Sequence, residues 1–132
     1  MLYGSDKLAT CKPALIRLFE RVAESWDCEC REGHRERAAQ DRAFAEGASK
    51  LKWPDGPHNA LPSNAADMYP RPIPDQETPK GRATYYAFAG YVMGVAREMG
   101  IPIRPGFDWD GDHDLMDQTF DDLVHFELKE AR

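Results

Sequence analysis

Proline and glycine divide this chain into short segments, and their positions constrain its fold more than any other feature. Pro70, Pro72, Pro74 and Pro79 stand close together. They exclude a helix interior or a central strand there, because proline has no backbone N–H to donate. Gly100 followed by Pro102 is typical of a helix end. Residues 48–63 are rich in Gly, Pro, Asn and Ser and predict a loop.

Between these breaks, the spacing of apolar residues predicts both helices and strands. Helices are expected from Pro13 and over 36–46 and 79–99, after a helical turn near Ser5. The longest helix would turn inward a row of five side chains: Ala83, Ala87, Tyr91, Val95 and Met99. Short strands are expected over 28–31, 65–69, 101–104 and 123–128. Because no regular β-α-β alternation is present, we predict an α+β fold, in a single domain of residues 1–132.

The composition narrows the range of partners. A net charge of −6 excludes a nucleic-acid partner, because no basic stripe is available to neutralise phosphates. No apolar run reaches the ~20 residues of a membrane helix, so membrane insertion is not expected. Residues 1–7 lack the basic and apolar regions of a signal peptide, which predicts a cytoplasmic protein. An odd count of three cysteines does not make a disulfide framework and favours a reducing compartment.

Two histidines and one aspartate are candidate metal ligands. His58 lies in the predicted loop, and the small residues Ala65 and Ala66 leave room beside Asp67 in the strand that follows. His125 lies among apolar residues of the last predicted strand, where a buried imidazole needs a polar partner. Two imidazoles and one carboxylate are a ligand set of catalytic zinc, which keeps its fourth position for water. The alternative is an exposed loop His58 and a merely hydrogen-bonded His125.

Asp122 is the candidate general base. A hydrolytic zinc site needs a carboxylate near the activated water but off the metal, and Asp122 stands three residues before His125. Positions three apart on an extended strand face opposite ways, so this role requires a turn or bulge near Asp122. Asp121 competes for the same role, and both could instead be solvated turn residues.

Two further features suggest ligands. Arg35 follows Gly33-His34 at a strand-to-helix junction, where a guanidinium could hold a substrate carboxylate or an oxyanion, or simply face solvent. Asp108, Asp110 and Asp112 imitate the start of a calcium loop. The match is incomplete, because position twelve is Thr119 rather than Glu, and a solvated acidic turn is the alternative.

Three stretches together resemble the small zinc peptidases of phage endolysins, which are related to D-alanyl-D-alanine carboxypeptidases. They are residues 32–50, with Gly33-His34-Arg35; residues 58–70, with His58-Asn59, Pro62-Ser63 and Ala65-Ala66-Asp67; and residues 108–128, ending in Asp122-Leu123-Val124-His125-Phe126-Glu127-Leu128. The likeness covers nearly the whole chain in the same order. It departs from the family at Gly56, where many relatives carry serine, and at Val124, where proline is common.

This resemblance implies a fold, a site and a reaction. The fold would be α+β with a small antiparallel sheet and flanking helices, like the hedgehog signalling domain and the D-alanyl-D-alanine peptidases. The implied zinc ligands are His58, Asp67 and His125, with Asp122 as base and acid and Arg35 as the stabiliser of the oxyanion. The substrate would be the peptidoglycan stem peptide, cut at an L-alanyl-D-glutamate or a D-alanyl-D-alanine-type bond. Endolysins of this type stay in the host cytoplasm until they are released to the wall.

Three functions follow as hypotheses from different classes. The first is a peptidoglycan endopeptidase acting as a monomer, cutting L-alanyl-D-glutamate. The second is a carboxypeptidase that trims terminal D-alanine. The third is a zinc-stabilised binding module without catalysis. Asp122 beside His125 favours an enzyme, since a binding module needs no base.

Overall fold

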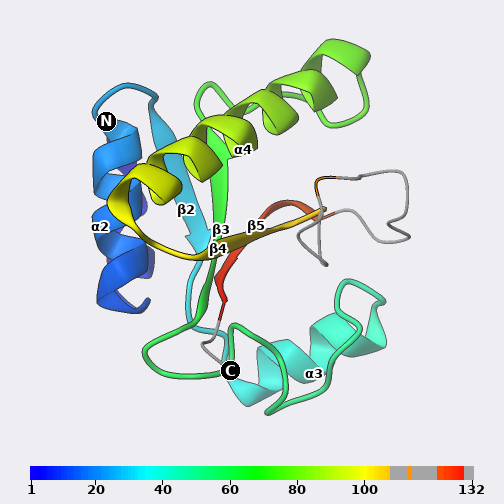
Figure 1. The fold of residues 1–132 in the computed structure, drawn as a ribbon. Helices are drawn as coiled ribbons and strands as arrows, with labels where there is room; N and C mark the ends of the chain where they lie inside the picture. Colours follow the sequence, from blue (N-terminus) through cyan, green and yellow to red (C-terminus); the bar gives the residue numbers. More distant parts are fainter. Residues whose placement is uncertain (108–112, 114–121, 130–132) are drawn as a thin grey trace.

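The computed structural model of the chain describes residues 1–107, 113 and 122–129. Figure 1 shows the elements in order along the chain. They are β1 (Leu2–Tyr3), α1 (Ser5–Leu8), α2 (Pro13–Ala23), β2 (Cys28–Glu32), α3 (Arg37–Ala45), β3 (Ala65–Pro70), α4 (Pro79–Met99), β4 (Ile103–Gly106) and β5 (Asp122–Leu128).

The strands form one five-stranded sheet in the order β1-β2-β3-β5-β4. Strands β2, β3, β5 and β4 pair antiparallel with their neighbours, whereas the two-residue β1 pairs with β2 in parallel. The α+β prediction with a small antiparallel sheet is therefore confirmed, with one short parallel strand added at the edge.

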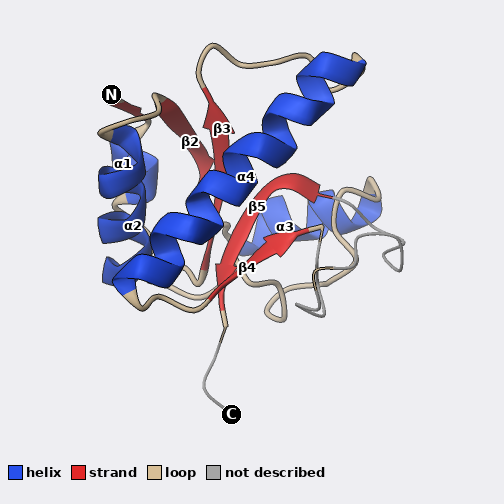
Figure 2. Ribbon diagram, turned by 45° about the horizontal axis from the view of Figure 1, so that its top comes forward, coloured by secondary structure: helices blue, strands red, loops and turns tan. Residues whose placement is uncertain are grey.

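Helices α2 and α4 cover one face of this sheet, and α3 lies apart from both (Figures 1 and 2). The core lies between these helices and the strands, where Phe126 of β5 meets Phe19 and Phe88 edge to face, with ring centroids 5.5 and 6.2 Å apart. Side chains alternate along a strand. Cys28, Cys30 and Met68 therefore enter the core, while Glu29, Asp67 and Tyr69 point to the other side, here called the open face.

Helix α4 begins and ends where the sequence predicts. The Thr78 hydroxyl accepts a hydrogen bond from the Gly81 amide at 3.0 Å, Pro79 occupies the first helical position, and Gly100 ends the helix with φ of 72°. In the described part of the chain, no helix has the length and apolar character that crossing a membrane requires.

The predicted inward face of α4 is wrong in its first three positions, whereas Val95 and Met99 are partly buried and pack against the core. Ala83, Ala87 and Tyr91 are exposed, and the buried positions are Tyr85, Phe88, Ala89, Val92 and Ala96. Five positions spaced by four residues drift around an α-helix by about 40° at each step, so they cannot form one stripe. The two large rings of Tyr85 and Phe88 set the buried face instead, because they cover more apolar surface than alanine does.

The three cysteines are free and buried, in agreement with the prediction that they form no disulfide framework. Burial raises the pKa of the Cys11 and Cys28 thiols to about 11 and that of Cys30 to about 12. They are packing residues of the core, since a thiol with such a pKa stays protonated and unreactive at neutral pH.

Candidate metal centre

Strand pairing brings two of the predicted ligands together. Strands β3 and β5 pair antiparallel, and Asp67 lies directly opposite His125 in their register. Directly opposed residues have their side chains on the same face of a sheet. Ala65 and Ala66, which precede Asp67, are both fully buried, and Ala66 belongs to the core on the other face of the sheet. These two ligands are therefore positioned by the rigid middle of the sheet.

The third ligand, His58, comes from the long loop between α3 and β3. The Arg35 amide donates to the His58 carbonyl at 2.7 Å, and the Asn59 amide donates to the carbonyl of Gly56 at 2.9 Å. The His58 ring is 2% exposed, and its Nδ1 lies 2.7 Å from the carbonyl oxygen of Gly33. A loop that would otherwise be mobile is thus held against the end of β2.

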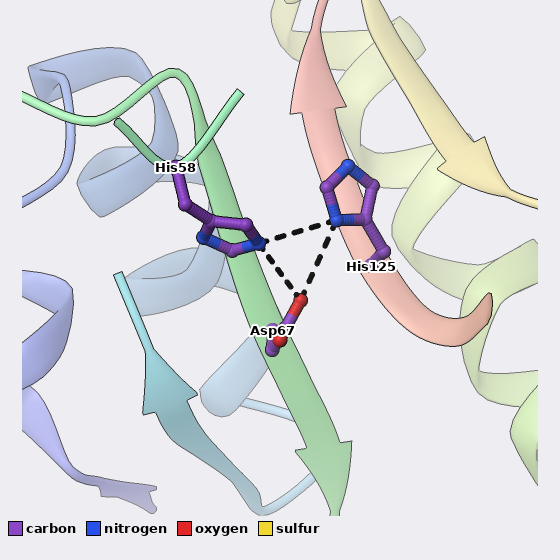
Figure 3. Close-up of side chains that lie close together, drawn as sticks. All are labelled: His58, Asp67 and His125. Atoms are coloured by element: carbon purple, nitrogen blue, oxygen red, sulfur yellow. Dashed lines mark hydrogen bonds and ion pairs between the residues drawn. The ribbon is translucent and has the colours of Figure 1, made fainter. Parts of the chain in front are cut away.

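The three side chains point toward a common centre (Figure 3). His58 Nε2 lies 3.3 Å from His125 Nδ1 and 3.2 Å from Asp67 Oδ1, and His125 Nδ1 lies 3.5 Å from the same carboxylate oxygen. In a tetrahedral zinc site with bonds of about 2.0–2.1 Å, neighbouring ligand atoms are about 3.3–3.4 Å apart. The observed triangle has these dimensions.

The hydrogen bonds outside the triangle determine which nitrogens face inward. A backbone carbonyl accepts only, so His58 Nδ1 carries the proton and donates to Gly33. His125 Nε2 donates in the same way to Glu127 Oε1 at 2.8 Å. When each ring carries one proton, His58 Nε2 and His125 Nδ1 turn lone pairs toward Asp67 Oδ1, a buried oxygen that accepts no hydrogen bond within the described part of the chain. Three converging acceptors repel one another unless a cation lies between them, so the residues present fit a metal ion.

The electrostatics of the group also favour a cation. Burial on its own would raise the pKa of Asp67, but the His58 and His125 rings outweigh it and hold the pKa well below its usual range. Burial would lower the pKa of His125, but its contacts with Asp67 and Glu127 raise it to about 9. The centre therefore attracts a proton strongly when no metal is bound, and a metal ion takes the place of that proton.

Asp122 is placed beside the centre by the bulge that its predicted role requires. Strand β4 pairs Pro105 with Phe126, but the next residue, Gly106, pairs with Asp122, so the register shifts within β5. His125 Cβ and Asp122 Cβ lie 2.9 and 3.0 Å from the point where a Cβ on Gly106 would stand. Burial raises the pKa of Asp122, and the charge of Asp67 raises it further. Such a carboxylate is suited to exchanging protons.

Comparison with known proteins identifies the family. Residues 3–129 match the family model of the phage L-alanyl-D-glutamate peptidases. The chain belongs to this family. The crystal structure of the Serratia marcescens L-Ala D-Glu endopeptidase ChiX has a similar fold, with a TM-score of 0.75 at 24% identity over 98% of this chain and 90% of that one. A search of curated proteins gave no match.

Family membership confirms the resemblance and makes the chain a peptidase that acts on peptidoglycan. The buried group of His58, Asp67 and His125 is one that could bind a metal, as expected for a metallopeptidase.

In this peptidase Arg35 is held by its own neighbours. Its Nε and Nη2 donate to the two carboxylate oxygens of Glu32 at 2.8 Å each, and its Nη1 donates to Gln40 Oε1 at 3.0 Å. The pKa of Arg35 is raised chiefly by the hydrogen bond to Glu32, with smaller effects of Asp67 and Asp122. The Arg35 side chain is only 13% exposed, which excludes the alternative of a fully solvated surface arginine.

Steric crowding explains why this chain has Gly56 where many relatives carry serine. A Cβ at this position would lie 2.7 Å from Asn59 Oδ1 and 2.9 Å from Gln40 Oε1. The Gly56 amide donates to that same Asn59 oxygen at 2.8 Å, and Asn59 Nδ2 donates to Gln40. In this chain a serine could enter only if this network moved, so Gly56 belongs to the support of His58.

Glu127 and Arg104 are site residues that sequence reasoning missed. Glu127 accepts from His125 Nε2, and its other oxygen accepts from Arg104 Nη2 at 2.9 Å. Burial would raise the pKa of Glu127, but the hydrogen bonds from His125 and Arg104 lower it, so the carboxylate stays charged. A signal was present, because Glu127 stands two residues from His125 and so shares its face of the strand.

Part of the prediction lies outside the described residues. The proposed calcium loop of Asp108, Asp110 and Asp112 falls there, and so does Asp121, the competitor for the role of base. His34 lies within them but outside the metal centre, with its Nδ1 3.0 Å from the Ala60 carbonyl oxygen.

Proposed function

We propose that this chain is a zinc-dependent endopeptidase that cuts the L-alanyl-D-glutamate bond of the peptidoglycan stem peptide. The zinc ligands would be His58 Nε2, Asp67 Oδ1 and His125 Nδ1. One observation carries the proposal: these three buried acceptor atoms lie 3.2–3.5 Å apart, with both outer imidazole N–H groups already engaged. Two imidazoles and one carboxylate are a common ligand set of zinc hydrolases.

Asp122 would move the proton during hydrolysis. When bound, zinc supplies Lewis acidity, which polarises a carbonyl and acidifies water. The Cβ atoms of Asp122 and His125 both lie against Gly106. The Asp122 carboxylate accepts from the Val124 amide at 3.4 Å and takes no part in the ligand triangle. It would accept a proton from the attacking water and donate it to the leaving amine. Its raised pKa makes the second transfer easier than it would be for an ordinary aspartate.

Arg35 would stabilise the negative charge that develops on the carbonyl oxygen. A guanidinium has five N–H groups, and Glu32 and Gln40 together take three of them. The remaining two lie on Nη1 and Nη2, on a group whose position and orientation are fixed by those neighbours. A cation held in this way stabilises a developing oxyanion without first having to reorganise.

The two other functions are less well supported. A non-catalytic zinc module has no use for a half-buried carboxylate of raised pKa beside its metal ligands. A D-alanyl-D-alanine carboxypeptidase would use the same centre, but the family that matches residues 3–129 is named for the L-alanyl-D-glutamate bond. We further propose a lytic role, in which the enzyme reaches the wall from the host cytoplasm at lysis.

Digestion of purified peptidoglycan by the zinc-loaded protein tests the function directly. Mass spectrometry should find fragments ending in L-alanine and fragments beginning with D-glutamate. Asp122→Asn should keep its zinc and lose activity by about 10²–10⁴-fold, the usual contribution of a general base. Asp121→Asn is the matched control and should stay active.

Three results would contradict the proposal. Release of free D-alanine would indicate the carboxypeptidase. Binding to the wall without any new termini would indicate the binding module. Full activity in Asp122→Asn together with loss in Asp121→Asn would transfer the role of base to Asp121.

A further inference from the structure

The open face of the sheet continues beyond the metal centre along β3 and β2. Tyr69 follows Asp67 on the same face, and β2 pairs Glu29 with Tyr69 and Glu32 with Asp67. Between these pairs the register shifts, so Arg31 is the additional residue of a bulge beside Asp67 and Tyr69. A bulge next to an active site commonly redirects a side chain.

Arg31 is directed over the Tyr69 ring. Its guanidinium carbon lies 5.1 Å from the ring centroid, within the range of a cation–π contact. Its Nε donates to Glu29 Oε2 at 3.0 Å. The ring and Glu29 thus fix the orientation of Arg31.

The charges of this cluster leave an excess of one cation. Glu29 accepts from Arg31 and, through Oε1, from Arg71 at 2.6 Å, so one carboxylate is shared between two guanidinium groups. Within the described part of the chain, no carboxylate accepts from the Nη groups of Arg31. The Arg31 side chain is 51% exposed. By comparison, the side chain of Glu127, the charged residue that accepts from His125, is only 12% exposed. Of these two charged side chains, Arg31 is therefore the one more accessible to a peptide.

The substrate offers an anion in the corresponding place. A glutamyl residue has two carboxyl groups and uses only one to extend the peptide, so the other is free. In an L-alanyl-D-glutamate bond this residue carries the leaving nitrogen, which puts its free carboxylate close to the bond that breaks. A stacked, pre-oriented guanidinium is the group best suited to a planar carboxylate.

We propose that Arg31, held over Tyr69 by Glu29, binds the free carboxylate of the glutamyl residue and gives the enzyme a preference for it. This inference rests on the proposed function and adds a specificity residue to it.

The test uses two synthetic stem peptides that differ only at the glutamyl residue, one with the free carboxylate and one with a carboxamide. We expect the zinc-loaded wild type to favour the carboxylate by about tenfold in kcat/KM, mainly through KM, as one good charged contact would give. Arg31→Gln should bring the ratio close to one, and Arg31→Lys should give an intermediate ratio. Arg82→Gln is the matched control, because Arg82 also lies over a tyrosine ring, that of Tyr86, at 5.9 Å. It should keep the wild-type ratio.

The results separate this proposal from the one on which it rests. A wild-type ratio of one, or an unchanged ratio in Arg31→Gln, would overturn the role of Arg31 while leaving the endopeptidase intact. A wild type that cuts neither peptide would overturn the proposed function and this inference together. A purely structural role for Arg31 would lower the melting temperature and affect both peptides equally, which would also overturn the assignment.

Discussion

The two histidines of the centre present different nitrogens inward, and their outer hydrogen bonds explain the difference. His58 donates through Nδ1 to the Gly33 carbonyl, whereas His125 donates through Nε2 to the Glu127 carboxylate. Such partners fix the tautomer and the ring orientation of a ligand, and a charged partner also makes the imidazole a stronger donor to the metal. Glu127 and Arg104 therefore belong to the metal centre although neither is a ligand.

Replacing Glu127 should weaken metal binding. Glu127→Gln keeps an acceptor for His125 Nε2 but removes the charge, and Glu127→Ala removes both. We expect zinc affinity to fall about 10–100-fold, more in the alanine variant, as is usual for outer partners of metal ligands. Competition with a chromophoric chelator measures the affinity. Glu20→Gln, an exposed change on α2, serves as the control. Equal affinity in all four proteins would exclude Glu127 from the centre.

At the scale of elements, the bulge in β5 is what brings Asp122, the proposed base, close to His125. Asp122 and His125 would face opposite ways on a regular strand, and the shifted pairing with β4 turns both toward Gly106. Gly106 is the residue that permits this approach, since a Cβ there would lie 2.5 Å from the Asp122 carbonyl oxygen.

Gly106→Ala should therefore damage both stability and catalysis. We expect unfolding to become easier by about 1–3 kcal/mol, the usual cost of overpacking, because the obstructing atoms include backbone. Catalysis should fall further than zinc binding, since the spacing of Asp122 and His125 changes. Thermal denaturation, metal content and peptide hydrolysis test this.

Helix α4 provides the control for that change. Gly94→Ala adds a Cβ with no heavy atom within 4 Å, and it should stabilise the helix by about 0.5–1 kcal/mol. If Gly106→Ala stabilised the protein as Gly94→Ala is expected to do, the bulge in β5 would not require a glycine at position 106.

At the scale of the whole molecule, the candidate metal centre brings together side chains from segments that lie far apart in the sequence. Asp67 and His125 come from the sheet, and His58 comes from the loop that links α3 to β3. An ion that binds only the folded chain stabilises it by an amount that grows with the logarithm of its concentration relative to its dissociation constant. We therefore predict that metal binding and folding are coupled in this peptidase.

This coupling should depend on pH. In the metal-free protein the pKa of His125 is raised from 6.5 to about 9, so its contribution to stability is complete below pH 6.5 and is lost as the pH rises through 9. Zinc competes with that proton and binds better as the pH rises. The gain in melting temperature on adding zinc should therefore increase from pH 6 to pH 9. Calorimetry with zinc and with a chelator measures it, and a gain that is constant or falls with pH would contradict this coupling.

The sequence by itself determined several helix boundaries, whereas the strand expected over 101–104 lies at Ile103–Gly106. Pro13 begins α2, Gly47 follows α3 with φ of 78°, and Gly100 ends α4, because proline and glycine act on the backbone dihedral angles of their immediate neighbours. The resemblance of three stretches also sufficed to name the family and to select three side chains that converge in the fold, His58, Asp67 and His125. The cysteines are free, as their odd number led us to expect.

Only the tertiary structure decided which side chains meet. The pairing of Asp67 with His125, the bulge that turns Asp122 inward, the support of Glu127 by Arg104 and the buried face of α4 all depend on partners far away in the chain. Sequence periodicity describes one element at a time, whereas strand register and core packing are set by the fit between elements. For the same reason, the position of Arg31 over Tyr69 could be read only from the folded sheet.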